Sequence, residues 1–226
     1  MGRILKMRRL LIALNNIGVP EVPEYPTLPN MPGIPAWPDG EYSTTTKIFY
    51  TSNDSVVTPY SSTAFGSTII SNTFNSSYNM YVLEFDGDVN SVGSNAFRNR
   101  SALCNVVLPN SVTSIGDRAF YYCSDLDSIN TGENITTIGA SSFSTCNLTA
   151  ISLGPKLTTI GQYAFYGCES LALVYCMATT PPKGSYGMFE GINENCKIHV
   201  PMSSVDSYKS ASYWSNYADM IIGYNF

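Results

Sequence analysis

The chain has 226 residues, of which 44% are hydrophobic and 13% are charged, and its formal net charge is −5. The charged fraction is about half the ~25% that is usual for soluble domains, and the acidic balance excludes a generally basic nucleic-acid-binding protein. No apolar stretch approaches the ~18 residues of a membrane-spanning helix. The abundance of Tyr, Ser, Thr, Asn and Gly is typical of a fold with many short strands and turns.

Residues 1–19 form a basic and then apolar segment. Positions 3, 6, 8 and 9 carry Arg or Lys, and an apolar run follows at residues 10–14. A secretory signal peptide needs roughly 7–15 apolar residues and a small-residue cleavage site. We therefore recognise no Sec signal peptide here and interpret the segment as an anchor that docks into a partner. A frayed basic tail is the alternative.

Residues 20–40 have a proline at every third position from Pro20 to Pro38. Because polyproline II has about 3 residues per turn, these prolines line one edge of a left-handed helix. The residues that precede the later prolines form an apolar stripe: Val22, Tyr25, Leu28, Met31, Ile34 and Trp37. We interpret the segment as a strap that lies in a groove, on the chain's own repeats, on a carrier or on sister copies. A stiff linker is the alternative.

Repeats begin at about residue 41. Phenylalanines recur with a period of 22–24 residues, at Phe74, Phe97, Phe120, Phe143, Phe165 and Phe189. Around them recurs the string L-x-x-V-x-L, then a turn, then S/T-x-I-G-x-x-A-F. A period of 20–29 residues with this pattern is the leucine-rich-repeat signature. The pattern predicts a capping hairpin and a first partial repeat over 41–73, repeats over 74–201 and a C-terminal cap over 202–226.

Each repeat is expected to bury its V-x-L residues from one short strand and its Ile and Phe from a helical turn or 3₁₀ piece on the opposite side. The Gly after the repeat Ile permits a tight or positive-φ turn. Lys47–Thr51 and residues 56–59 are predicted to pair as a hairpin. Ser203 and Asp206 are predicted to form a capping box that opens a helix over 204–212, with a closing strand from Met220 to Tyr224.

Three stretches carry a family resemblance: "SVTSIGDRAFYYCSDLDSI", "ITTIGASSFSTC" and "LTTIGQYAFYGCESLALV". They resemble the BspA-like leucine-rich-repeat family, and the likeness covers about residues 47–226. It implies a right-handed repeat solenoid, α/β or mainly β, with a parallel sheet on one side and short helices or 3₁₀ turns on the other. It further implies adhesion or protein recognition at an exposed surface and supplies no catalytic residue. Members of this kind are typical of gut anaerobic bacteria.

The reactive side chains do not form a catalytic pattern. Cys123, Cys146 and Cys168 each follow the repeat Phe by three residues, which indicates a column of buried, reduced thiols. His199 is the single histidine, and a nucleophile needs a base beside it. No C-x₂-C pair occurs, so zinc is not expected. We predict a protein that is not an enzyme and has no cofactor or metal.

Function is therefore expected to depend on surfaces. Strand residues that point away from the core form the candidate binding face: Glu84, Asn105, Val107, Ser128, Asn130, Ser152, Leu173, Tyr175, Lys197 and His199. We expect a protein or glycan ligand there, and a protein carrier or self-association through residues 1–40. The preferred interpretation is a decoration or fibre-type protein displayed on a phage virion of gut bacteria. The alternative is a cell-surface or secreted adhesin.

Overall fold

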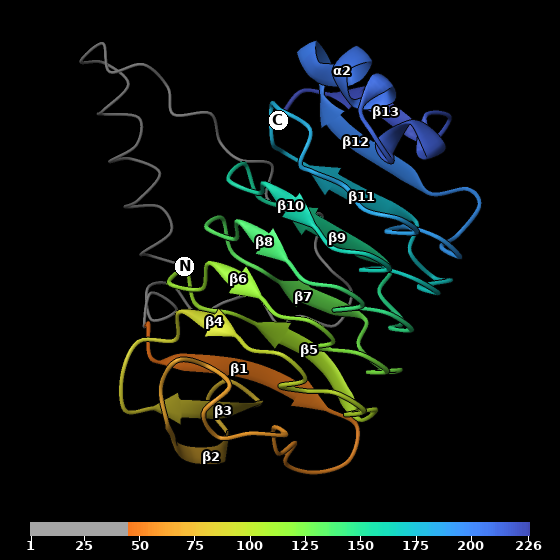
Figure 1. The fold of residues 1–226 in the computed structure, drawn as a ribbon. Helices are drawn as coiled ribbons and strands as arrows, with labels where there is room; N and C mark the ends of the chain where they lie inside the picture. The colour runs from red at the N-terminus through yellow and green to blue at the C-terminus, as the bar shows by residue number, and fades with distance from the viewer. Residues whose placement is uncertain (1–44) are drawn as a thin grey trace, which may run out of the picture. The chain divides into compact units, whose positions relative to one another are not determined.

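The computed structural model describes residues 45–226 (Figure 1). The predicted anchor (1–19) and strap (20–40) lie outside the described residues, so the apolar stripe at Val22, Tyr25, Leu28, Met31, Ile34 and Trp37 stays a prediction.

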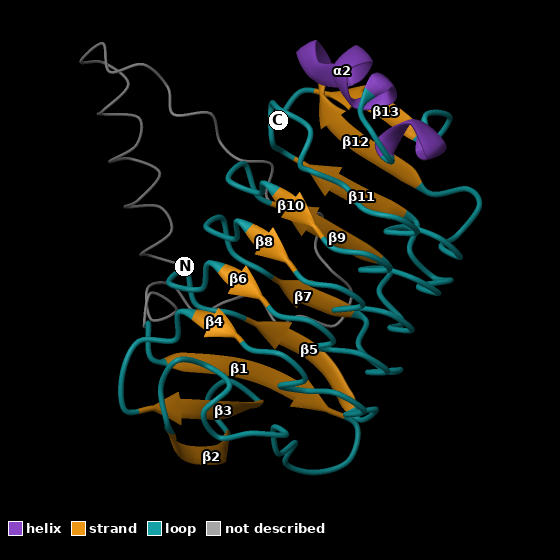
Figure 2. Ribbon diagram, viewed as in Figure 1, coloured by secondary structure: helices purple, strands orange, loops and turns teal. Residues whose placement is uncertain are grey.

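The repeats stack as parallel coils of a solenoid, and each central coil contributes a short and a longer strand (Figures 1 and 2). The short strands are β4 (Ser91–Val92), β6 (Ser114–Ile115), β8 (Thr137–Ile138) and β10 (Thr159–Ile160), which form one parallel sheet. The longer strands are β5 (Leu103–Val107), β7 (Ser128–Asn130), β9 (Ala150–Leu153), β11 (Leu173–Cys176) and β12 (Lys197–Pro201). The predicted leucine-rich-repeat solenoid is confirmed.

A column of stacked phenylalanines runs through the core. Its members are Phe65, Phe97, Phe120, Phe143, Phe165 and Phe189, all at most 1% exposed. Neighbouring ring centroids are 5.2–5.6 Å apart. No coil could bury such a ring alone, so stacking supplies the core.

The first member of that column differs from the prediction. Phe65 is fully buried and lies 5.6 Å from Phe97, whereas Phe74 is 52% exposed on β2 (Ile69–Asn75). The assignment of Phe74 to the repeat column is wrong. The hairpin formed by β2 and β3 (Met80–Phe85) lies between Phe65 and the next repeat, so the regular spacing of 23 points to the wrong ring.

The predicted pairing of Lys47–Thr51 with residues 56–59 is also wrong. β1 (Lys47–Ser52) lies between β3 and β5 and runs antiparallel to both. Residues 56–59 form no strand; they follow β1 as a loop whose Val57 N–H donates to the Tyr50 hydroxyl at 2.9 Å. The sheet order β2-β3-β1-β5-β7 therefore joins an antiparallel cap to the first parallel coils.

The glycines of the I-G motif serve close approach between coils. A Cβ at Gly116, Gly139 or Gly161 would lie 2.5–2.6 Å from a backbone nitrogen of the preceding coil, a distance that real Cβ atoms do not adopt. None of the three has a positive φ. Glycine is needed at these positions because it has no side chain, which allows the backbones of two neighbouring coils to approach closely.

The segments between the short and long strands are runs of turns. In each, the residues two before and two after the repeat Phe have positive φ, as at Asn95 and Asn99 or Arg118 and Tyr122. Their N–H groups donate to carbonyls of the next coil, for example Asn95 to Asp117 at 2.9 Å and Asn99 to Tyr121 at 2.8 Å. Among the described residues, helices occur only in the C-terminal cap.

The cap covers the last coil with aromatic side chains. It comprises η2 (Met202–Ser204), α2 (Val205–Ser210), η3 (Trp214–Tyr217) and β13 (Ile221–Tyr224), and β13 pairs in parallel with β12. Tyr208 and Trp214 are fully buried, and Trp214 lies 5.8 Å from Phe189. The structure has a helix at Val205–Ser210 and a closing strand at Ile221–Tyr224, within the ranges predicted for them. The capping box is wrong, because α2 has no side-chain cap and the Ser204 hydroxyl donates to the Thr179 carbonyl instead.

The predicted thiol column is confirmed. Cys123, Cys146 and Cys168 are buried, and each Sγ donates to the carbonyl of a phenylalanine in the preceding coil at 3.0–3.1 Å. All six cysteines are free.

Candidate functional site

The candidate binding face is mostly buried in its N-terminal half. Val107 is 6% exposed because it packs with Phe49, Met80 and Val82 in a small second apolar cluster. Ser128 is 1% exposed and donates to the Asn105 amide oxygen. The Asn105 amide nitrogen donates to Thr51 Oγ1 at 2.7 Å.

The predicted exposure of Asn105, Val107 and Ser128 is therefore wrong. The antiparallel strand β1 lies beside β5 and supplies Phe49 and Thr51 as partners, and the sequence alternation of β5 and β7 does not reveal this. Of the remaining predicted positions in this half, Glu84 is half-buried and forms an ion pair with Lys47 at 2.8 Å. Asn130 and Ser152 are half-buried, and the Asn130 side chain accepts from the N–H of Gly132.

The C-terminal half of the face carries an aromatic group. The rings of Tyr175 and His199 stack with centroids 4.7 Å apart, and Tyr224 packs edge-on against both. Leu173 is half-buried and Lys197 is exposed. The structure thus brings together Leu173, Tyr175, Lys197 and His199 from β11 and β12, as predicted, in parallel register.

Desolvation governs the titration of the reactive side chains. Partial burial lowers the pKa of His199, and its Nδ1 atom is buried and has no hydrogen-bond partner in the described part of the chain. Burial raises the pKa of Cys123 and of Cys168 to about 12, and it raises the pKa of Cys146 well above the usual value of a thiol. A thiol is a nucleophile only as thiolate, so these three side chains are structural. Within residues 45–226, no three His, Cys, Asp or Glu side chains are grouped as metal ligands would be.

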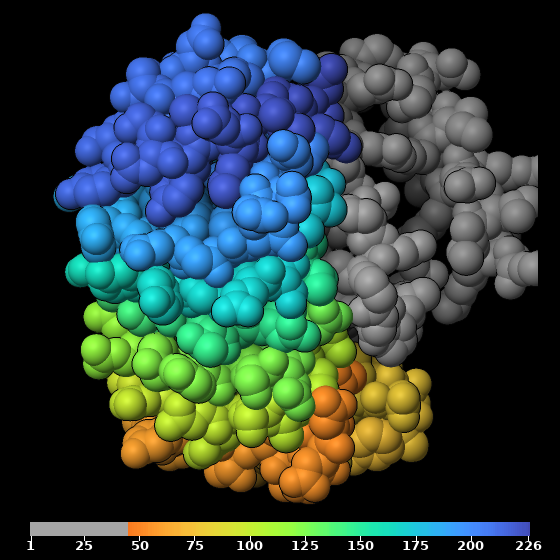
Figure 3. All heavy atoms as spheres, turned by 90° about the vertical axis from the view of Figure 1, so that its right-hand side faces the viewer, coloured from red at the N-terminus to blue at the C-terminus, as the bar shows by residue number. Residues whose placement is uncertain are grey.

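A second surface lies along the turns that carry the repeat Phe, the side of the solenoid that Figure 3 faces. Tyr163 lies at its centre, with its ring edge-on to Tyr166 at 5.4 Å and to Tyr186 at 5.5 Å. Tyr121 and Tyr122 form a second pair at 4.9 Å. We call these five residues the tyrosine edge. Tyr122 is 50% and Tyr186 is 57% exposed.

Two of these tyrosines occupy backbone positions that disfavour them. Tyr122 has φ 57° and Tyr163 has φ 56°, in the left-handed region that is uncommon for bulky residues. Equivalent turn positions in other coils carry Asn or Gly, which adopt this region at lower cost, but also Arg118, Ser141 and Thr145. Large side chains that are half-exposed and also strained are not explained by the needs of the core.

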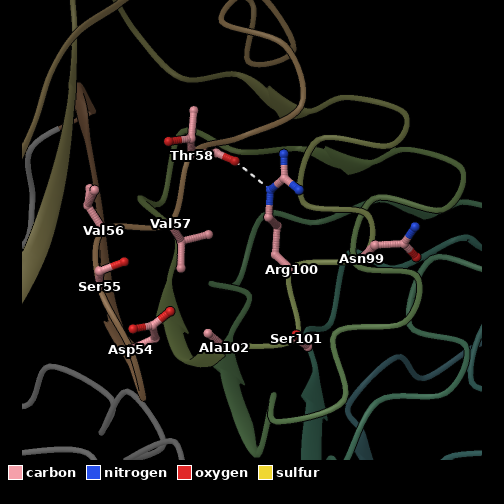
Figure 4. Close-up of a pocket in the computed structure, with 9 residues that line it drawn as sticks. All are labelled: Asp54, Ser55, Val56, Val57, Thr58, Asn99, Arg100, Ser101 and Ala102. Atoms are coloured by element: carbon pink, nitrogen blue, oxygen red, sulfur yellow. Dashed lines mark hydrogen bonds between the residues drawn. The ribbon is translucent and has the colours of Figure 1, made fainter.

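A pocket lies at the N-terminal end of the same side, between the loop after β1 and the turn before β5 (Figure 4). Its volume is about 270 Å³. The lining residues are Asp54, Ser55, Val56, Val57, Thr58, Asn99, Arg100, Ser101 and Ala102. Arg100 Nε donates to the Thr58 carbonyl, and its guanidinium lies 5.8 Å from the Tyr60 ring centroid.

Sequence reasoning found neither of these two surfaces. The tyrosine edge has a signal in the sequence, since 16 tyrosines are many for this length and five of them fall within three residues of a repeat Phe. The pocket has none, because it depends on how the loop after β1 folds back over the first coil, where the Asn53 N–H donates to the Ala102 carbonyl at 3.0 Å.

Comparison with known protein families identifies the family of this chain. Residues 45–172, more than half of the chain, match six copies of the BspA-type leucine-rich-repeat region. The chain belongs to the BspA-type leucine-rich-repeat family. A search of curated proteins finds no match. No helix among residues 45–226 has the length and apolar character to cross a membrane.

Solved structures of three proteins are similar to part of the chain. A leucine-rich cell surface protein from Faecalibacterium prausnitzii is 27% identical with a TM-score of 0.45, and the match covers 57% of this chain and 32% of that one. The pneumococcal vaccine antigen PcpA is 18% identical with a TM-score of 0.45, covering 61% and 40%. A leucine-rich-repeat protein from Bacteroides ovatus is 25% identical with a TM-score of 0.35, covering 58% and 38%. The chain thus matches at most two fifths of each of these proteins.

Proposed function

We propose that this BspA-type protein is a non-enzymatic recognition module of the adhesin type, and that the tyrosine edge is its main contact surface. The observation that carries the proposal is the group of five neighbouring tyrosines along the turns, of which Tyr122 and Tyr163 hold left-handed backbone positions. Residues kept in such conformations cost about 1–3 kcal/mol each and cluster where a ligand is bound.

The chemistry of the tyrosine edge suits recognition. A tyrosine offers a large, rigid and amphipathic contact area and loses little conformational entropy on binding. The neighbouring turn positions carry Asn, Ser, Thr and Gly, a composition shared with antibody binding loops. The stacked coils hold these side chains on a rigid frame, which lowers the entropic cost of binding further. The expected partner is a protein or glycan at a host or bacterial surface.

The C-terminal half of the strand face is a second candidate surface. Leu173, Tyr175, Lys197 and His199 combine aromatic rings with one positive charge on neighbouring strands. Glu84, Asn130 and Ser152 border the closed half and contribute less contact area. The two surfaces lie on different sides of each coil, so they can be tested separately.

The experiment uses fluorescently labelled full-length protein on mucin-coated surfaces, on host epithelial cells and on gut bacterial cells. We expect saturable binding to at least one of these surfaces. The combined variant Tyr122→Ser, Tyr166→Ser, Tyr186→Ser should weaken that binding by at least tenfold. Tyr213→Ser is the matched control, because Tyr213 is also exposed with a positive φ but lies in the C-terminal cap. Saturable binding that the triple variant leaves unchanged would refute the role of the tyrosine edge.

We further propose that residues 1–40 attach the solenoid to a larger assembly, with a phage virion as the preferred carrier and the bacterial cell surface as the alternative. Six buried apolar side chains of ~1.5–3 kcal/mol each would supply a stable attachment. Full-length protein should therefore associate with itself or with its carrier. Tyr25→Ser, Leu28→Ser, Ile34→Ser should release a folded monomer, whereas Thr27→Ser, Asn30→Ser should not.

Light scattering after size-exclusion chromatography measures the self-association. Sedimentation of native protein with virions or with cell envelopes distinguishes the two carriers. A wild-type chain that is monomeric and absent from both fractions would contradict the attachment.

A further inference from the structure

The pocket at the N-terminal end of the turn side contains a cation, Arg100, that has no anionic partner among residues 45–226. Arg100 uses Nε to bind the Thr58 carbonyl, which fixes the plane of its guanidinium. Its two terminal nitrogens make no hydrogen bond with a described residue, and no carboxylate of the described chain lies within ion-pair distance. Figure 4 shows the guanidinium between the loop that carries Thr58 and the turn that carries Asn99.

The planar guanidinium presents forked donors that match a carboxylate. Neutral polar residues accompany it in the lining: Ser55, Asn99 and Ser101. Water-exposed charges of this kind contribute little alone, but a preoriented fork that binds two oxygens at once gives geometric specificity.

Asp54, the other charged residue of the lining, determines which further chemical groups the ligand needs. Asp54 lies across the pocket from the Arg100 guanidinium (Figure 4). Its carboxylate accepts hydrogen bonds and repels a second negative charge, so a dianionic phosphate fits poorly. A ligand with one carboxylate at the Arg100 end and hydroxyl donors at the Asp54 end is complementary to both.

The volume and the apolar part of the lining limit the size of the ligand. About 270 Å³ is at the lower end for small-molecule sites and suits a single sugar ring. Val56 and Ala102 provide apolar surface against which the C–H groups of a ring can pack. We propose that this pocket binds a carboxylate-bearing sugar residue, such as a uronic or sialic acid, at the end of a glycan.

This inference deepens the proposed recognition function but occupies a different site from the tyrosine edge. Asn99 and Tyr122 hold equivalent turn positions in successive coils, and the Asn99 N–H donates to the Tyr121 carbonyl at 2.8 Å. A glycan that ends in the pocket would therefore continue toward the tyrosine edge.

The test is titration of full-length protein with methyl β-glucuronide and N-acetylneuraminic acid, followed by NMR. Methyl β-glucoside is the neutral match, and N-acetylalanine, which has one carboxylate, tests a carboxylate from a peptide. We expect at least one acidic sugar to shift the methyl signals of Val56, Val57 and Ala102. The neutral glucoside and N-acetylalanine should bind at least about tenfold more weakly, the factor expected for a charge-assisted hydrogen bond and for the sugar hydroxyls.

Variants locate the interaction. Arg100→Gln should weaken the acidic-sugar affinity by about tenfold or more, and Arg118→Gln, an exposed arginine of the next coil, should leave it unchanged. Arg100→Lys keeps the charge without the fork and should also weaken binding, which separates fork recognition from loss of charge. The tyrosine triple variant should still bind the monosaccharide, so failure of the two proposals is distinguishable.

The methyl shifts are measured on the wild-type protein, so this part of the test does not require that any variant folds. Equal binding of glucoside and glucuronide, tighter binding of N-acetylalanine, or shifts confined to other methyl groups would overturn the inference.

Discussion

Phe120→Ala is the sharpest perturbation of the stacked core. The Phe120 ring is fully buried, and it stacks on Phe97 and Phe143 at 5.2 Å with interplanar angles of 11° and 4°. Truncation of a buried Phe to Ala costs about 3–5 kcal/mol through lost transfer energy and the remaining cavity. Because each coil contacts only its neighbours, the cavity also weakens the interface between the coils on either side.

Equilibrium urea unfolding, followed by circular dichroism, measures this cost. The matched control is Phe74→Ala: the same change at a ring that is 52% exposed, for which we expect less than about 1 kcal/mol. At about 2–4 °C per kcal/mol for a chain of this size, Phe120→Ala should lower Tm by about 6–20 °C. If the two variants lose equal stability, the phenylalanine column does not carry the core as described.

Three further predictions concern the close contacts between coils and the thiol column. Gly139→Ala places a Cβ 2.6 Å from backbone atoms of the preceding coil and should lower the free energy of unfolding in urea by about 1–3 kcal/mol. Gly87→Ala is the control: its new Cβ meets only the flexible Ser67 side chain, so the loss of stability should be smaller. Cys123, Cys146 and Cys168 should react with a thiol reagent far more slowly than half-exposed Cys104 in the native state, and fast labelling of the column would contradict their burial. Burial raises the pKa of Cys123 and Cys168 from 9.0 to about 12 in the folded state. Their contribution to the free energy of unfolding is therefore complete below pH 9 and falls as the pH rises from 9 to 12. A urea midpoint that stays constant over that pH range would contradict this prediction.

The repeats were predictable because their apolar residues recur in phase, and a solenoid needs little more than that phase. Phe97 to Phe189 and the cysteine column were assigned from spacing alone, and the structure agrees. The N-terminal cap was not predictable in this way. It breaks the period, so the spacing rule selected Phe74 over Phe65, which lies 32 residues before Phe97.

The surface was harder to predict than the core. Strand alternation identified the outward residues, but not that β1 pairs with β5 and closes the face over Val107 and Asn105. The Thr51–Asn105 hydrogen bond joins residues 54 positions apart, and no local pattern encodes it. The positive φ at Tyr122 and Tyr163, which marks the tyrosine edge, is likewise visible only in the backbone.

Hydroxyl-radical footprinting of tyrosine side chains tests the recognition surface most directly. Full-length protein is oxidised free in solution and bound to whichever mucin, host or bacterial surface retains it, and the modification rates are compared by mass spectrometry. The account predicts that Tyr122, Tyr166 and Tyr186 are protected on binding and that Tyr213 is not. Unchanged rates at all three, or protection of Tyr213 instead, would contradict it.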